Sequence, residues 1–320
     1  MQDFAFLSAV QTLALLANLG VSLALLMEGA GLASLALGWV VGQGLPPLVF
    51  WLRLRSRHPE LLFTRLPMLS WGEARRQIGQ GLWVTLNQIA TTLFMATDVF
   101  LIGFLIGPAT VVPYSCTTRL IHILGNQAQS GLQFSLPALA EVHASNTRER
   151  ALGVTLSLTL CLLLASGLVV CVLLAVNGAF VSWWLGPEQY GGPLLNGLLL
   201  LAMVLRHWNT AVIFSLFCFG HNRRIPLTLI ADGLMTTAVS FLLISTGRPL
   251  GAPVGSLVGV CLVSLPLNVT ALAATVGVSL RELLAPLAGW AVRIVLLAAG
   301  AVAASLCMPA AGSDRAFVFC

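Results

Sequence analysis

The chain has 320 residues, of which 58% are hydrophobic and only 8% are charged. Water-soluble domains carry about 25% charged residues, so this composition excludes an ordinary soluble domain and indicates an integral membrane protein. The formal net charge of +5 comes from arginine without lysine, and we assign it to loops at the membrane surface rather than to a nucleic-acid site. The seven cysteines form no C-x-x-C pair, and neither a disulfide framework nor a metal site is predicted.

Nine apolar stretches are long enough to cross a bilayer, which takes about 20 residues. We therefore predict an all-α, polytopic membrane helix bundle of about nine transmembrane helices. Pro46, Pro47 and Pro266 fall inside these stretches and predict kinks or broken helices. The predicted spans are 4–27, 31–52, 79–98, 110–136, 152–175, 193–219, 226–246, 252–275 and 287–309.

The arginines predict the orientation of these spans. Every second loop is rich in arginine, and these loops together contain eleven arginines. The loops between them contain only Arg248. Cytoplasmic loops carry the excess of basic residues, so the arginine-rich loops and the N-terminus are predicted to be cytoplasmic. The arginine-rich loops are 53–78, 137–151, 220–225 and 276–286, and the alternate loops are 28–30, 99–109, 176–192 and 247–251.

Six polar residues in the fourth predicted span follow one another at steps of three or four residues, which places them on one helix face. A polar face exposed to lipid is unfavourable by several kcal/mol, so this face is predicted to line a hydrophilic cavity. We call these residues the polar stripe. They are Ser115, Arg119, His122, Asn126, Gln129 and Gln133.

Three arginines fall within predicted spans: Arg119, Arg206 and Arg293. They could form a cationic lining for an anionic ligand, through charge-assisted hydrogen bonds, or each could pair with a buried acid or extend to the interface. Two acids, Asp98 and Asp232, are candidate ion-coupling or counter-ion residues, with structural pairing as the alternative. The candidate substrate-binding residues are Arg206, Arg119, His122, Asn126, Gln129, Gln133 and Asn209.

No hydrolytic or nucleotide-binding motif appears in the sequence, so an enzyme is not expected and no cofactor is assigned. From the third span onward, short motifs resemble the second half of polysaccharide flippases of the multidrug/oligosaccharidyl-lipid/polysaccharide (MOP) exporter superfamily. The resembling segments are Asp98 to Gly103, Leu105 to Ala109, Tyr114, Arg119-Leu120, Pro137 to Ala140, Arg148 with Arg150, Phe180 to Gly186, and Gly220 to Arg224.

The resemblance implies a partial MOP-type transporter with two lobes around a central cavity. Residues 1–52 would be the last two helices of the N-terminal lobe, 53–78 a cytoplasmic linker, 79–275 the C-terminal six-helix lobe, and 276–320 an additional helix and tail. About four N-terminal helices of the family pattern are missing, so the chain is expected to be a fragment, a truncated gene model or a remnant.

The implied function is a flippase in the bacterial inner membrane that translocates an undecaprenyl-pyrophosphate-linked oligosaccharide for surface polysaccharide biosynthesis. Its expected partners are membrane lipid, a polysaccharide polymerase and other assembly proteins, with no nucleic acid. Two alternatives remain open at this stage. One is a cation-coupled multidrug exporter of the same fold, and the other is a non-transporting membrane subunit.

Overall fold

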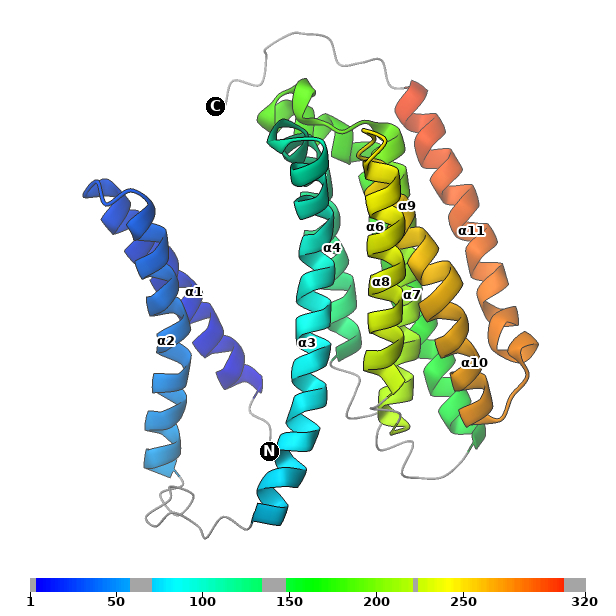
Figure 1. Ribbon diagram of the computed structural model, residues 1–320, viewed down its shortest axis with the longest axis horizontal. Helices are drawn as coiled ribbons and strands as arrows, with labels where there is room; N and C mark the ends of the chain where they lie inside the picture. The colour runs from blue at the N-terminus through cyan, green and yellow to red at the C-terminus, as the bar shows by residue number, and fades with distance from the viewer. Residues whose placement is uncertain (1–3, 58–70, 134–147, 221–223, 308–320) are drawn as a thin grey trace. The chain divides into compact units, whose positions relative to one another are not determined.

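The computed structural model describes residues 4–57, 71–133, 148–220 and 224–307, and every regular element in these ranges is a helix (Figure 1). The predicted all-α, polytopic class is therefore confirmed. The chain divides into two compact units, Met1–Gln77 and Ile78–Cys320. The boundary between the units falls inside helix α3 (Trp71–Leu105).

The first unit is a helical hairpin of α1 (Phe4–Met27) and α2 (Leu32–Arg57). Small residues on α2 let the two backbones approach closely: a Cβ at Gly38 would collide with the Ser22 hydroxyl, and one at Gly42 would lie 2.9 Å from the Asn18 Cβ. α2 remains helical through Pro46 and Pro47. The expected break at that position is therefore not observed.

The second unit holds the remaining helices, and the candidate transmembrane rod that precedes α11 is irregular. α9, a single π-helical turn called η3, and α10 follow one another without a loop, and Pro266 lies in the first turn of α10. The sequence predicted a kink or a broken helix at Pro266, and the structure has a π-turn immediately before the helix that contains Pro266. The elements are α4 (Pro108–Gln133), α6 (Arg148–Leu185), the 3₁₀ turn η2 (Pro187–Gln189), α7 (Pro193–Cys218), α8 (Arg224–Ile244), α9 (Gly251–Gly259), η3 (Val260–Ser264), α10 (Leu265–Val276) and α11 (Leu280–Cys307).

Seven helices in the described ranges are long and apolar enough to cross a membrane. Two predicted spans are not among these seven. The span 79–98 falls in α3, and the span 110–136 falls in α4 as far as Gln133, with residues 134–136 outside the described residues. The polar stripe lowers the hydropathy of α4. The seven spans are Phe6–Met27, Leu32–Arg57, Leu152–Leu185, Pro193–Cys218, Arg224–Ile244, Gly251–Val276 and Leu280–Gly300.

Several predicted loops are shorter than expected, and two of them show the reason. α6 continues through most of the predicted loop 176–192 and ends before Gly186, whose φ of 107° favours glycine. α2 and α3 each extend into the predicted linker 53–78. In both places a helix continues past the apolar stretch, because backbone hydrogen bonding does not stop where hydropathy falls. The linker residues 58–70, the segment 134–147 with its Pro137 motif, residues 221–223 and the tail 308–320 lie outside the described residues.

Two apolar clusters occupy the ends of the second unit. One joins α3, α4, α7, α8 and α9 around Ile102, Leu195 and Ile244. The other joins α7, α8, α10 and α11 around Leu216 and Leu272. Polar side chains on the middle turns of α7, α8 and α9 lie between these clusters.

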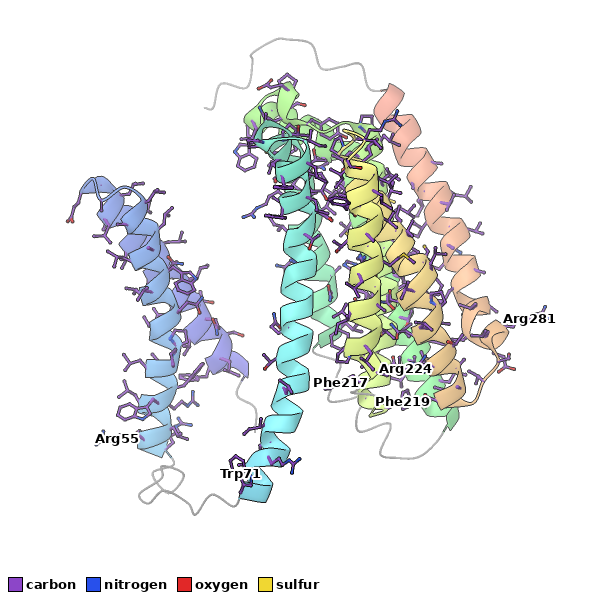
Figure 2. The ribbon with its side chains drawn as sticks, in the orientation of Figure 1. Arg55, Trp71, Phe217, Phe219, Arg224 and Arg281 are labelled. Atoms are coloured by element: carbon purple, nitrogen blue, oxygen red, sulfur yellow. The ribbon has the colours of Figure 1, made fainter. Side chains whose placement is uncertain are left out.

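Arg224 and Arg281 lie at one end of the second unit, together with Phe217 and Phe219 (Figure 2). These two arginines belong to two of the loops that the sequence assigns to the cytoplasm. Their position at one end agrees with an alternation of basic and non-basic loops. The side of the membrane on which that end lies remains a prediction.

Candidate functional site

Arg206 lies in the middle of α7 and is the centre of the polar contacts in the second unit. Its side chain is 23% exposed, and its Nη1 donates to the Asp232 carboxylate on α8 at 3.2 Å. Its Nε donates to the Ser256 hydroxyl on α9 at 2.7 Å, and its Nη2 donates to the Ser256 carbonyl at 3.2 Å. One arginine therefore connects three helices, using the several N–H groups of its planar guanidinium.

Asp232 is completely buried, and each of its carboxylate oxygens accepts hydrogen bonds. Oδ2 accepts from Arg206 and, at 2.8 Å, from the Ser264 hydroxyl, whereas Oδ1 accepts from the Thr236 hydroxyl at 3.1 Å. A buried carboxylate is tolerated when its charge is paired and its lone pairs are hydrogen-bonded, and both conditions hold here. We call Arg206, Asp232, Thr236, Ser256 and Ser264 the Arg206 cluster.

Three glycines at steps of four residues on α9 let α8 approach closely. A Cβ at Gly255 would collide with the Ser240 hydroxyl, and a Cβ at Gly259 would collide with Asp232 and Thr236. Asp232, Thr236 and Ser240 follow one another at steps of four residues on α8. This polar face thus packs against the glycine face of α9. Small residues at such spacing are typical of closely packed membrane helices.

The π-turn η3 lies directly after α9 and ends at Ser264. A π-turn closes i→i+5 hydrogen bonds and so contains one residue more than an α-turn, and such turns are frequent at functional sites. Here it separates two side chains on the same rod, Ser256 and Ser264, that both contact the Arg206–Asp232 pair.

Asn209, a predicted substrate-binding residue one turn after Arg206, is buried. Its side-chain oxygen accepts a hydrogen bond of 2.9 Å from the Asn268 amide on α10. Two residues of α7, at positions i and i+3, therefore contact the same rod on either side of the π-turn. For Asn209 the structure shows a contact between helices.

Four other buried polar residues, which the sequence did not single out as a group, join α6 to α7. Asn177 donates to Asn196 at 2.8 Å, and the Ser166 hydroxyl lies 2.7 Å from Nδ1 of His207. Each of these polar residues is isolated and belongs to no periodic pattern. The sequence therefore does not indicate which residue, more than fifteen positions away, is its hydrogen-bond partner. Such contacts are the usual way in which polar side chains join membrane helices.

The polar stripe on α4 has a different environment. Arg119, His122 and Asn126 are exposed on the surface of the second unit, and Gln129 is half-buried. Gln133 is the last residue of α4. The neighbouring face of α4, about 100° around the helix from the stripe, packs inward through buried Tyr114, Thr117, Ile121, Gly125 and Leu132. The stripe therefore faces outward from a unit whose other exposed residues are mostly apolar.

Asp98 lies near the end of α3 and is half-buried. It accepts a hydrogen bond of 3.1 Å from the Tyr114 hydroxyl on α4. Its charge also interacts with that of Arg206. Arg293 is exposed on α11. The structure thus places one of the three intramembrane arginines in an ion pair and leaves the other two at the surface of the unit.

The described residues contain no group of three or more histidine, cysteine, aspartate or glutamate side chains that could hold a metal ion. Fold and site together define a multi-pass helical membrane protein with one internally paired polar cluster and one outward-facing polar stripe.

Comparison with protein families identifies the particular group. Residues 1–188 match the family described as "Polysaccharide biosynthesis protein", and the chain belongs to this family. It is 24% identical over 197 residues to the "Putative O-antigen transporter" of Escherichia coli (strain K12). That alignment covers 61% of this chain and 47% of the relative, so the chain spans about half the length of the relative that it matches. No solved structure matches the chain. The polar stripe lies inside the residues matched by the family, whereas Arg206 and Asp232 lie beyond them.

Proposed function

We propose that this chain is part of a flippase that moves a lipid-linked oligosaccharide across the bacterial inner membrane for surface polysaccharide biosynthesis. The family assignment supports a role in polysaccharide biosynthesis, and the name of the Escherichia coli relative supports transport. A transporter requires no catalytic residues of its own. The proposal therefore places the protein among transporters rather than enzymes.

The observation that carries the proposal is the exposure of the polar stripe on α4. Arg119, His122 and Asn126 point out of a unit whose surface is otherwise mostly apolar. Charged and amide groups that face hydrocarbon are unfavourable. For a single arginine, insertion scales give a cost of about 2.5–3.5 kcal/mol. The stripe is therefore expected to border a water-filled path, along which the polar sugars would pass.

The proposed substrate is an undecaprenyl-pyrophosphate-linked oligosaccharide. In the proposal, the guanidinium of Arg119 meets the pyrophosphate, because planar guanidinium groups bind phosphate oxygens in a bidentate way. His122, Asn126, Gln129 and Gln133 would hydrogen-bond the sugar hydroxyls. Arg206 is less suited to this role than the sequence indicated, since most of its donors are already used within the protein.

A non-transporting membrane subunit remains the second candidate, and the transport assay below distinguishes it from a flippase. A cation-coupled multidrug exporter is disfavoured. Its substrates are often cationic, and the exposed stripe carries an arginine and no acid.

The test is a flipping assay in proteoliposomes containing the full chain and a fluorescent polyprenyl-pyrophosphate disaccharide. Dithionite, which does not cross the bilayer, reduces only the probe molecules in the outer leaflet, so flipping appears as loss of the protected fraction. We expect flipping by the wild type, and a rate at least about tenfold lower for Arg119→Gln if one charge-assisted contact is lost. Arg248→Gln, which removes the same charge from an exposed turn, is the control.

Equal flipping by Arg119→Gln and the wild type would remove Arg119 from the proposal. Absence of flipping by the wild type chain alone, restored by an added membrane partner, would favour the subunit function instead. Active efflux of a cationic dye, without flipping of the disaccharide probe, would favour the multidrug exporter.

A further inference from the structure

α9, η3 and α10 form one continuous rod. The segments before and after its π-turn pack on different neighbouring helices. α9 packs closely on α8 through Gly251, Gly255 and Gly259. α10 packs on α7 through the Asn209–Asn268 hydrogen bond and through an apolar cluster around Leu216 and Leu272. α8 makes much less contact with α7 than with α9. The rod thus takes part in two helix pairs, α8 with α9 and α7 with α10. Two contacts cross between these pairs: Arg206 of α7 donates to Ser256 of α9, and the Arg224 guanidinium of α8 donates to the Leu267 carbonyl of α10 at 2.8 Å.

Without the π-turn, residues that precede it and residues that follow it could not both contact α7. Ser256 and Asn268 are separated by twelve residues, which in a regular α-helix turn about 120° beyond three full turns. Two side chains that far apart around the helix could not both face α7. One extra residue in the π-turn absorbs most of this difference, so that Ser256 reaches Arg206 and Asn268 reaches Asn209.

The Arg206 cluster spans the junction between the two helix pairs. Arg206 belongs to α7, whereas its partners Asp232 and Ser256 belong to α8 and α9. The Ser264 hydroxyl, at the last residue of η3, donates to the same carboxylate oxygen as Arg206. The ion pair and the end of the π-turn are thus coupled through one carboxylate.

We propose that Val260–Ser264 is a hinge between the α8–α9 pair and the α7–α10 pair, and that the Arg206–Asp232 ion pair holds this hinge in the described arrangement. A π-turn and an α-turn of the same residues differ by a rotation of the following segment. The conversion moves α10 relative to α8, which breaks the exposed Arg224–Leu267 hydrogen bond, while α10 stays packed on α7. The use of this motion in transport rests on the proposed function, whereas the hinge itself does not.

Deletion of Leu262 separates the hinge from the contacts around it. Leu262 is 66% exposed, so its side chain contributes little packing within the unit. Without it, Ser256 and Asn268 are eleven residues apart, which is about 20° beyond three full turns of a regular α-helix. Both side chains therefore still face α7. The deletion is expected to yield a continuous α-helix that keeps its contacts and lacks only the hinge.

The experiment measures distances between spin labels in the full chain, in nanodiscs and with the seven native cysteines replaced. One label pair reports on the hinge: Leu227 on α8 and Ala274 on α10, both exposed. The control pair shares the second label: Phe217 on α7, which is also exposed, and Ala274. We expect two distances for the hinge pair in the wild type, one distance for the control pair, and one distance for both pairs in the variant lacking Leu262.

A single distance for the hinge pair in the wild type would overturn the proposal, as would two distances that persist after deletion of Leu262. Because the wild-type measurement decides by itself, a deletion variant that failed to fold would not leave the proposal untested. Asp232→Asn keeps the shape and removes the charge, so it is expected to raise the share of the second distance. An unchanged distribution would exclude the ion pair as the contact that holds the hinge.

The flipping assay then separates the hinge from the proposed function. We expect the variant lacking Leu262 to flip the disaccharide probe at least about tenfold more slowly than the wild type, since conformational steps limit such cycles. Full flipping by a variant with one distance would exclude the hinge from transport. Two distances in a wild type that does not flip would support the hinge and count against the flippase function.

Discussion

The polar stripe on α4 and the Arg206 cluster are both sets of polar residues on helices of the second unit, but they differ in burial and in contacts. In the Arg206 cluster, Asp232 is fully buried and accepts from Arg206, Thr236 and Ser264. On α4, Arg119, His122 and Asn126 are exposed on the surface of the unit. Polar residues on neighbouring helices of one unit can therefore differ in environment: one set is buried and hydrogen-bonded across helices, and the other faces outward.

The largest effect is expected from Asp232→Ala, which would leave the Arg206 charge unpaired. Breaking a buried ion pair costs about 3–5 kcal/mol, and we expect the lower end of this range because the Arg206 side chain keeps 23% exposure. The free energy of unfolding, measured by steric trapping in bicelles, checks this. Asp232→Leu combined with Arg206→Leu should recover most of the loss. Equal instability of the double variant would show that the charge was not the cause.

A smaller effect is expected from Gly259→Ala, because its Cβ would collide with Asp232 and Thr236. Overpacking of this kind costs about 1–3 kcal/mol, and it would separate α8 from α9. The thermal unfolding temperature in detergent is the measurement. Gly197→Ala is the matched control, since a Cβ there has no neighbour within 4 Å. Equal stability of the two variants would contradict the close helix contact.

Cysteine substitutions on α4 test whether the polar stripe borders water. Cysteines at His122 and Asn126 are expected to react at least about tenfold faster with a membrane-impermeant maleimide than a cysteine at Ile123, because the reacting thiolate forms in water and not in lipid. Ile123 is exposed on the same helix, immediately beside the stripe. Similar labelling rates at the three positions would indicate that the stripe does not border water.

The smallest effect is expected from Asn268→Ala, which removes the hydrogen bond to Asn209 between α10 and α7. Such contacts between membrane helices contribute about 0.6 kcal/mol on average and about 1.7 kcal/mol at most. Steric trapping resolves a change of that size. Thr270→Ala, an exposed position on the same helix whose hydroxyl bonds only to its own backbone, is the control. A loss as large as that of Asp232→Ala would mean that the Asn209–Asn268 contact matters more than the ion pair.

Several features of this chain follow from its sequence. Its apolar stretches predict the helices, and the ends of α7 and α8 lie within two residues of the predicted spans. The step-of-four polar face on α8 also appears in the sequence, and Asp232, Thr236 and Ser240 are indeed buried together. The motifs resembling polysaccharide flippases agree with the family match.

Other features could not be derived in this way. The sequence left open whether Arg206 lines a cavity or pairs with an acid, since Asp232 is separated from it by 26 residues and lies on another helix. The π-turn has no signature in hydropathy, because one extra residue in an apolar rod changes no composition. The partners of Asn209 and His207 were not predicted, because a single buried amide or imidazole has no periodicity to match.

The sequence by itself determined that the chain is a membrane protein, which segments are helical, and which faces of those helices are polar. These properties follow from hydropathy and helix period, which are local. Only the tertiary structure decided which polar faces are paired inside the protein and which face outward, because a hydrogen-bond partner is fixed by the packing of helices distant in the sequence. That packing satisfies the polar face of α8 internally and leaves the polar stripe of α4 exposed.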